Sequence, residues 1–134
     1  MTAQNAELIR RAYEAFSRGD IPAVFGILDP DITWHVPGSS PLSGDYKGHD
    51  QVGAFFAATM ELSGGTFTIA VQDILAQQDQ VVVLCTVAAE RLGQSWSSPE
   101  VHVWRVAGTQ AVDFREFQGD QQTEDKFWSS PGPR

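Results

Sequence analysis

The sequence has few cysteines, few basic residues and no long hydrophobic run. Cys85 is the single cysteine of 134 residues, so an internal disulfide is excluded, and its place in the apolar run VVVLCTVAA predicts a buried structural thiol. The sequence has nine Lys and Arg and 17 Asp and Glu, which gives a formal net charge of −8. Nucleic acids and anionic membrane surfaces bind clustered basic residues, so this balance argues against both as partners.

Several segments and motifs with a defined chemistry are also missing. No basic segment followed by an apolar stretch opens the sequence, and no apolar run reaches the length of a membrane span, so we expect a cytoplasmic location. The histidines, His35, His49 and His102, show no HxH or HExxH spacing. GxSxG, P-loop and GxGxxG patterns do not occur. We therefore predict no metal and no cofactor.

The composition and the first half of the sequence predict helices in a single globular domain. Hydrophobic residues make up 42% and charged residues 19%, which is typical of one folded domain over residues 1–134. Apolar residues at helical spacing predict a helix in AQNAELIRRAYEAFSRGD, and Asp20 can cap a second helix that runs to Leu28. A third helix, roughly 50–62, carries four large apolar residues: Val52, Phe55, Phe56 and Met60.

The second half alternates with a period of two and predicts strands. Residues 31–36 form a first strand, followed by a Gly/Pro/Ser-rich loop. After residue 64 come the predicted strands TFTIAVQDILAQ, VVVLCTVAAERL, QSWSSPEVHVWRV and QAVDFREFQGD. Three helices before hairpin strands predict an α+β domain in which a curved, mainly antiparallel sheet wraps the helices and leaves a conical cavity. The tail is expected to make one helical turn around Phe127 and Trp128 and then to fray.

Alternation also predicts which side chains of the last two strands face that cavity. Apolar neighbours indicate that the inward face of one strand carries Glu100, His102, Trp104 and Val106. The same argument gives the next strand an inward face with Val112, Phe114, Glu116, Gln118 and Asp120. An imidazole and carboxylates would then share one cavity, and such a group can hold a proton ready near neutral pH.

The order of these segments resembles a known family. The set DITWHVPG, a glycine-rich loop, YKGHDQVGAFF, VHVWRV and VDFREFQGDQ is similar to the SnoaL-like branch of the ketosteroid isomerase/NTF2-like superfamily over about residues 5–128. The resemblance implies a cone-shaped α+β barrel with a pocket between sheet and helices, commonly as a homodimer. Isomerases, polyketide cyclases, epoxide hydrolases, dehydratases and non-enzymatic binders share this fold, so the fold alone does not give the function.

The resemblance suggests roles for individual residues. SnoaL-type polyketide cyclases have a histidine and an aspartate at the ends of their last strands, and His102 and Asp120 hold similar positions here. Ketosteroid isomerases carry a general-base aspartate where this sequence has Val36, which disfavours their usual reaction. Epoxide hydrolases need an Asp–Arg–Asp set, and Asp113 with Arg115 would serve only if both pointed inward.

We therefore expect a cofactor-independent enzyme that performs acid/base chemistry on a small, largely apolar carbonyl compound, such as a polyketide or terpenoid intermediate. The reaction would be isomerisation, aldol-type cyclisation or dehydration. The predicted catalytic residues are Asp120, His102 and Glu116. The predicted substrate-binding residues are Trp34, Tyr13, Trp104, Phe114, His35 and Phe56.

Two alternatives stay open. The same pocket could only bind a small molecule in a non-catalytic or scaffold protein, and an epoxide hydrolase is the third hypothesis. His35 is a special case among the site residues. By alternation it faces away from Trp34, unless a bulge near Pro37 turns it inward.

Overall fold

The computed structural model describes residues 2–130, which form four helices and one six-stranded sheet. The helices are α1 (Thr2–Ser17), α2 (Ile21–Ile27), α3 (Gly48–Leu62) and α4 (Gln121–Ser129). The strands are β1 (Leu28–Val36), β2 (Gly44–Lys47), β3 (Thr68–Gln77), β4 (Gln80–Arg91), β5 (Gln94–Ala107) and β6 (Gln110–Gln118). No helix among residues 2–130 is long and apolar enough to cross a membrane.

Local sequence explains the ends of two helices. At the start of α2, the side chain of Asp20 accepts a hydrogen bond from the N–H of Ala23 at 3.2 Å. At the start of α4, Asp120 accepts one from the N–H of Thr123 at 3.1 Å. Both caps satisfy N–H groups that have no partner within the helix. The predicted single turn at the tail is therefore a complete nine-residue helix.

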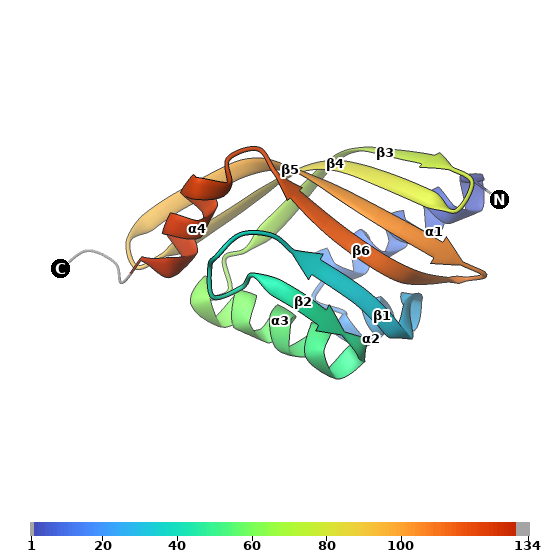
Figure 1. Cartoon of the computed structure of the whole chain (residues 1–134), viewed down its shortest axis with the longest axis horizontal. Helices are drawn as coiled ribbons and strands as arrows, with labels where there is room; N and C mark the ends of the chain where they lie inside the picture. The colour runs from blue at the N-terminus through green and yellow to red at the C-terminus, as the bar shows by residue number, and fades with distance from the viewer. Residues whose placement is uncertain (1, 131–134) are drawn as a thin grey trace.

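The sheet is curved and open. Its strand order is β2-β1-β6-β5-β4-β3, with β1 and β6 parallel and every other neighbouring pair antiparallel. Register shifts interrupt the β1–β6, β3–β4 and β5–β6 pairs, and such irregularities bend a sheet. Figure 1 shows the sheet wrapped over α1, α2 and α3, with α4 at one end. The predicted α+β class and curved sheet are confirmed, but β2 and β3 are free edges, so the sheet is not a closed barrel.

Two features differ from the prediction in detail. Residues 44–47, expected within a loop, form β2 and pair with β1, so that Trp34 lies opposite Tyr46. Strand β1 starts at Leu28, directly after α2, rather than at residue 31. The predicted fraying of the tail concerns residues 131–134, which lie outside the described residues.

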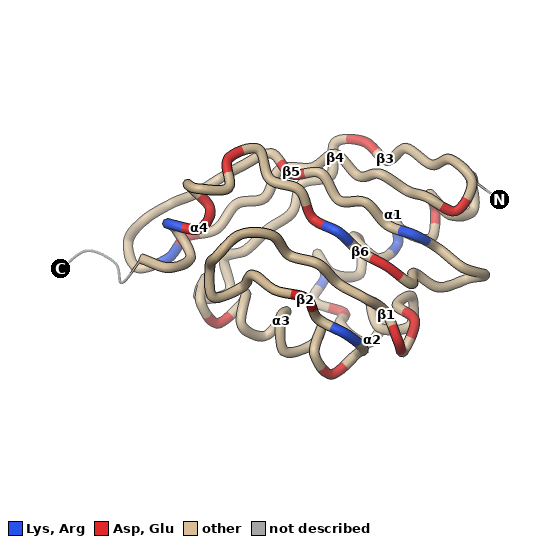
Figure 2. Tube along the Cα trace, viewed as in Figure 1, with Lys and Arg blue, Asp and Glu red and all other residues tan. Residues whose placement is uncertain are grey.

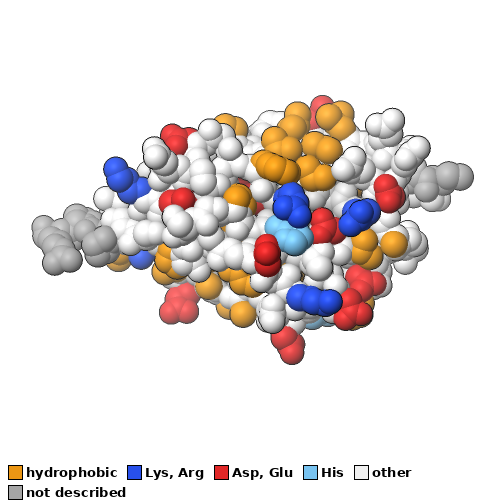
Figure 3. Space-filling model, viewed as in Figure 1, with side chains coloured by type: hydrophobic (Ala, Val, Ile, Leu, Met, Phe, Trp, Pro, Cys, Tyr) orange, Lys and Arg blue, Asp and Glu red, His pale blue; other side chains and the backbone are white. Residues whose placement is uncertain are grey.

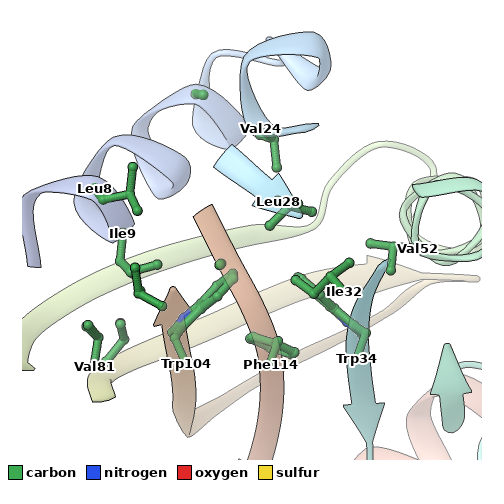
Figure 4. Packing of buried hydrophobic residues seen from close by; sticks show 14 of the residues in the cluster. Leu8, Ile9, Val24, Leu28, Ile32, Trp34, Val52, Val81, Trp104 and Phe114 are labelled. Atoms are coloured by element: carbon green, nitrogen blue, oxygen red, sulfur yellow. The ribbon is translucent and has the colours of Figure 1, made fainter. Parts of the chain in front are cut away.

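The core has two parts. The larger one lies between the sheet and α1–α3, and Figure 4 shows Trp34, Trp104 and Phe114 from three strands facing Ile9 of α1 and Val52 of α3. The smaller one joins α4 to the far end of the sheet through buried side chains: Leu42, Val87, Ala89, Trp96, Phe127 and Trp128. The helix α4 is therefore an integral part of the domain.

Candidate active site

A cavity of about 70 Å³ lies between the curved sheet and helices α1, α2 and α3. Most of its wall is aromatic: Tyr13, Phe16, Trp34, Phe55, Phe56, Phe67, Trp104 and Phe114. The polar part of the wall consists of Thr59, Glu100, His102 and Glu116, together with the hydroxyl of Tyr13. Cavities that hold drug-sized ligands measure about 300–1,000 Å³, so a ligand here is small or displaces side chains of the wall.

The structure places seven of the predicted site residues on this wall: Tyr13, Trp34, Phe56, His102, Trp104, Phe114 and Glu116. Strand alternation positions five of them, because successive side chains point to opposite faces of the sheet. Tyr13 belongs to the buried stripe of α1, and Phe56 to the sheet-facing side of α3. Their roles in binding or catalysis stay predictions.

Asp120 does not reach the cavity, so the prediction that it faces the pocket is wrong. Strand β6 ends at Gln118, and alternation no longer applies two residues later. The exposed carboxylate of Asp120 instead caps α4, where it also accepts a hydrogen bond from the hydroxyl of Thr123 at 2.7 Å. These hydrogen bonds lower the pKa of Asp120, which is the opposite of what a general acid needs.

His35 also lies away from the cavity, which contradicts its predicted place in the substrate site. Its ring is on the outer face of the sheet, where Nδ1 lies 2.8 Å from Asp45 and Nε2 lies 3.1 Å from Asp113. No register shift occurs between His35 and Val36 in the β1–β2 pairing, so no bulge turns the ring inward. The same outer face carries Arg115, which is exposed. The inward Asp–Arg pair that an epoxide hydrolase requires is therefore not formed, and that hypothesis does not fit.

A hydrogen-bonded chain connects α1 to β5 at the polar end of the cavity. The indole N–H of Trp104 can only donate, so the oxygen of Tyr13 accepts it at 3.0 Å. The hydroxyl of Tyr13 also lies 2.5 Å from Nδ1 of His102. The Nε2–H of the same ring donates to a carboxylate oxygen of Glu100 at 2.7 Å. Burial raises the pKa of Tyr13 well above its usual value, so the phenol keeps its proton in this chain.

Three carboxyl groups from three elements meet beside this chain. Glu100 of β5, Glu116 of β6 and Glu124 of α4 bring one oxygen each within 4.8 Å of the others. The amide nitrogen of Gln118 donates to both Glu100 and Glu116, at 2.9 Å to the latter. The amide nitrogen of Gln121 donates to Glu124 at 2.9 Å. A smaller cavity of about 30 Å³ adjoins this cluster and has all three carboxyl residues in its wall.

Burial and mutual repulsion change the acidity of two of these groups. Desolvation, followed by the charge of Glu100, raises the pKa of Glu116 to about 7, and His102 partly offsets this. Desolvation, followed by the charges of Glu116 and Glu100, raises the pKa of Glu124 to about 9. At neutral pH the carboxyl of Glu124 is therefore protonated. The carboxyl of Glu116 is then present in its protonated and its ionised form in similar amounts.

Two members of this cluster were not among the predicted site residues. Alternation had placed Glu100 on the same face as His102, so its role could have been found from the sequence. Glu124 lies one turn before Phe127 and Trp128 on the buried side of α4. The sequence could have indicated the position of Glu124 through Asp120. If Asp120 caps a helix, residues three and four positions apart share one face of that helix, so Glu124 lies on the same side as Phe127 and Trp128.

The donor atoms of the site could also hold a metal ion. Glu100, Glu116 and Glu124 form one possible set, and Cys85, Glu100 and His102 form another. Burial raises the pKa of Cys85 to about 12, and two of the carboxyls hold protons more tightly than usual, so a metal would have to displace protons from either set. The absence of a metal and of a cofactor stays a prediction.

Comparison with known proteins gives a consistent family. The model of the SnoaL-like domain matches residues 9–114. The uncharacterized protein Rv0034 of Mycobacterium tuberculosis is 32% identical over 124 residues, which cover 92% of this chain and 95% of Rv0034. Bal32a, from a soil-derived mobile gene cassette, has 33% identity and a TM-score of 0.91, with 95% of this chain and 98% of Bal32a covered. TerC, co-crystallized with polyporic acid, has 26% identity and a TM-score of 0.83, with 92% of this chain and 97% of TerC covered.

Proposed function

The chain belongs to the SnoaL-like domain family, and from its cavity we propose that it is a cofactor-independent enzyme acting on a small, largely apolar carbonyl compound. The reaction is proton abstraction next to the carbonyl, followed by isomerisation, aldol-type cyclisation or dehydration. A polyketide or terpenoid intermediate has the required chemistry. The observation that carries this proposal is Glu116, a partly buried carboxyl with a pKa of about 7 in the wall of a largely aromatic cavity.

Glu116 takes the acid/base role that was first expected of Asp120. A base works best when its pKa lies near the working pH, because it is then partly ionised and still binds a proton strongly. After Glu116 takes a proton from the carbon next to the carbonyl, it returns that proton at another carbon in isomerisation or to a leaving hydroxyl in dehydration. The aromatic wall excludes water and so strengthens these electrostatic interactions.

His102 and Trp34 support this reaction in different ways. His102 holds Glu100 by a hydrogen bond and lowers the pKa of Glu116 by its own charge, so it helps to set the protonation of the base. Trp34 lines the cavity, and its buried indole N–H has no hydrogen-bond partner among residues 2–130. The oxygen of a substrate carbonyl would accept this hydrogen bond and would gain negative charge as the proton leaves.

Deuterium exchange tests the proposal without knowledge of the natural substrate. We expect the protein to catalyse exchange of the hydrogens next to the carbonyl in D₂O, measured by NMR on small apolar ketones such as 2-tetralone. A positioned base contributes about 10²–10⁴-fold, so Glu116→Gln should slow the catalysed exchange by that factor. Glu61→Gln is the matched control, because Glu61 is an exposed residue on α3 outside the cavity wall. Full exchange by Glu116→Gln would rule out this base.

The non-catalytic alternative uses the same cavity. A protein that only binds would take up the ketone with measurable affinity and would not accelerate exchange of its hydrogens. Calorimetric binding together with a background rate of exchange would favour this alternative.

We also propose a homodimer formed through the outer face of the sheet. Figure 3 shows hydrophobic side chains gathered on this face beside basic, acidic and histidine side chains. Leu84 and Phe117 are 37% and 49% exposed, and Arg115 and Asp113 offer charges of both signs, as contact between identical surfaces requires. Sedimentation should give the mass of a dimer, and Phe117→Glu should give a monomer. The cytoplasmic location stays a prediction from the sequence.

A further inference from the structure

Acidic residues line the cavity without any Lys or Arg of residues 2–130 beside them. No Lys or Arg of the described residues lies in its wall or in that of the adjoining smaller cavity. The wall contains Glu100 and Glu116, and Glu124 lies beside them. Figure 2 shows the basic positions scattered along the chain rather than gathered in one place. A ligand carboxylate or phosphate would find no positive partner here.

The carboxyl cluster has a single imidazole partner for its three carboxyl groups. Within residues 2–130, the single ion-pair contact of these three residues is that of Glu100 with Nε2 of His102, at 2.7 Å. The other donors to Glu100 and Glu116 are neutral amide N–H groups of Gln118. Buried carboxylates are normally paired with a positive group, so three carboxyl groups beside one imidazole can accept a further cation.

One hydrogen-bond acceptor beside the carboxyl cluster has no donor among the described residues. The amide oxygen of Gln118 is buried and has no hydrogen-bond partner among the described residues, although the nitrogen of the same amide donates to both carboxylates. A buried acceptor without a donor is unfavourable. An ammonium group carries three N–H donors and a positive charge, which are the two properties that Gln118 and its carboxylate neighbours lack.

The aromatic wall fits the remainder of such a ligand. Trp34 and Trp104 meet edge to face with ring centroids 5.5 Å apart, and Trp34 stacks on Phe114 at 3.8 Å. Electron-rich ring faces attract organic cations, with indole the strongest of the aromatic side chains. Carboxylates at one end and indoles along the wall form a site for a cation with an apolar body.

We propose that this cavity binds a small organic cation, with a protonated amine at the carboxylates of Glu100 and Glu116 and an apolar body against Trp34 and Trp104. The inference names the substrate class of the proposed function and rests on it, since both use the same cavity: the substrate is a carbonyl compound that carries a basic amine. TerC was co-crystallized with polyporic acid, so a preference for cations would distinguish this chain from that relative.

Binding of such a cation is linked to the protons of the cluster. Six titratable groups face the site from the surrounding elements: Tyr13 on α1, Cys85 on β4, Glu100 and His102 on β5, Glu116 on β6, and Glu124 on α4. Burial keeps Tyr13 and Cys85 protonated, and Glu124 has a pKa of about 9, so Glu116 is the carboxyl that ionises near pH 7. The affinity for the cation should therefore increase as the pH rises through 7.

Three compounds of nearly equal shape test the inference: benzylamine, benzyl alcohol and benzoate. Titration calorimetry at pH 8.0 should give at least tenfold tighter binding of benzylamine than of benzyl alcohol, and no binding of benzoate. The preference for benzylamine should shrink at pH 5.5. Glu116→Gln should lose about tenfold in affinity for benzylamine and should narrow the preference for benzylamine over benzyl alcohol, whereas Glu61→Gln should behave as the wild type.

Equal affinity for amine and alcohol, tighter binding of benzoate, or no binding of benzylamine at millimolar concentration would each overturn the inference. Because the comparison of ligands uses the wild-type protein, it stands even if a variant fails to fold. Ketone exchange that depends on Glu116 without an amine preference would refute the inference and leave the proposed function intact. An amine preference without exchange would support the cation site and refute catalysis.

Discussion

Replacing the partly buried carboxyl of Glu116 by an amide should make the protein more stable above neutral pH. In the folded protein the pKa of Glu116 is about 7, against the ordinary 4.5 expected of the unfolded chain. That interval corresponds to about 3 kcal/mol. Glu116→Gln keeps the shape of the side chain and removes the charge. The free energy of unfolding of the variant, relative to the wild type, should therefore increase by about 2–3 kcal/mol between pH 5 and pH 8.

The direction of this change in stability follows from the number of protons that the folded and the unfolded protein bind. Between pH 4.5 and 7 the folded wild type keeps the proton of Glu116, whereas the unfolded chain releases it. Its stability therefore decreases as the pH rises through this window, and the decrease levels off above pH 7. Glu124, with a pKa of about 9, extends a similar decrease to higher pH. The charge of Glu116 contributes to that raised pKa, so the difference between the two proteins reports the charge of Glu116 together with its effect on Glu124.

Urea denaturation at pH 5, 6, 7 and 8, followed by tryptophan fluorescence, measures this difference. Glu61→Gln removes the same charge from an exposed site, and its difference from the wild type should stay within about 0.5 kcal/mol at each pH. A constant difference between wild type and Glu116→Gln across this range would refute the reasoning, because the buried carboxyl would then have an ordinary pKa.

Three further predictions concern other parts of the molecule. Asp120→Ala should lower the urea midpoint of unfolding through loss of the α4 cap, without slowing ketone exchange; slower exchange would show that Asp120 acts in the site. Cys85, with a pKa of about 12 and 2% exposure, should react with a thiol reagent only in denaturant, so rapid labelling of the native protein would contradict its burial. Gly38→Ala should cost more than the roughly 1–2 kcal/mol of Gly64→Ala, as measured by urea denaturation, because both glycines have positive φ and the new Cβ at position 38 would also displace the side-chain ends of Gln121 and Asp125, which hydrogen-bond to each other. Equal costs would contradict that contact.

Alternation within strands was sufficient to predict much of the cavity wall. In a strand the backbone itself sends successive side chains to opposite faces, so the apolar residues of β5 and β6 reveal the direction of their polar neighbours. Glu100, His102 and Trp104 were placed on one face by this argument, and the structure has all three in the cavity wall. The long apolar run around Cys85 likewise predicted a strand within the sheet, and it is β4.

The argument failed where a strand ended. Asp120 follows Gly119 beyond the end of β6, and the N–H groups at the start of α4 need an acceptor, so the cap determined its position.

The pairing of β1 with β6 is a different case. It aligns Trp34 with Phe114, 80 residues apart in the sequence, in the parallel pair of this sheet. Such contacts leave no local pattern, because they depend on how the whole chain folds back on itself.

The acidity of the site is beyond local sequence for the same reason. Glu116 stands between Arg115 and Phe117, which give no sign of a raised pKa. The pKa of about 7 arises because the surrounding elements remove Glu116 from water, β5 brings the charge of Glu100 close, and His102 offsets only part of the repulsion. Burial also raises the pKa of Glu124, and the charges of Glu116 and Glu100 raise it further. The chemistry proposed for this cavity is therefore a property of three elements packed together rather than of any one residue.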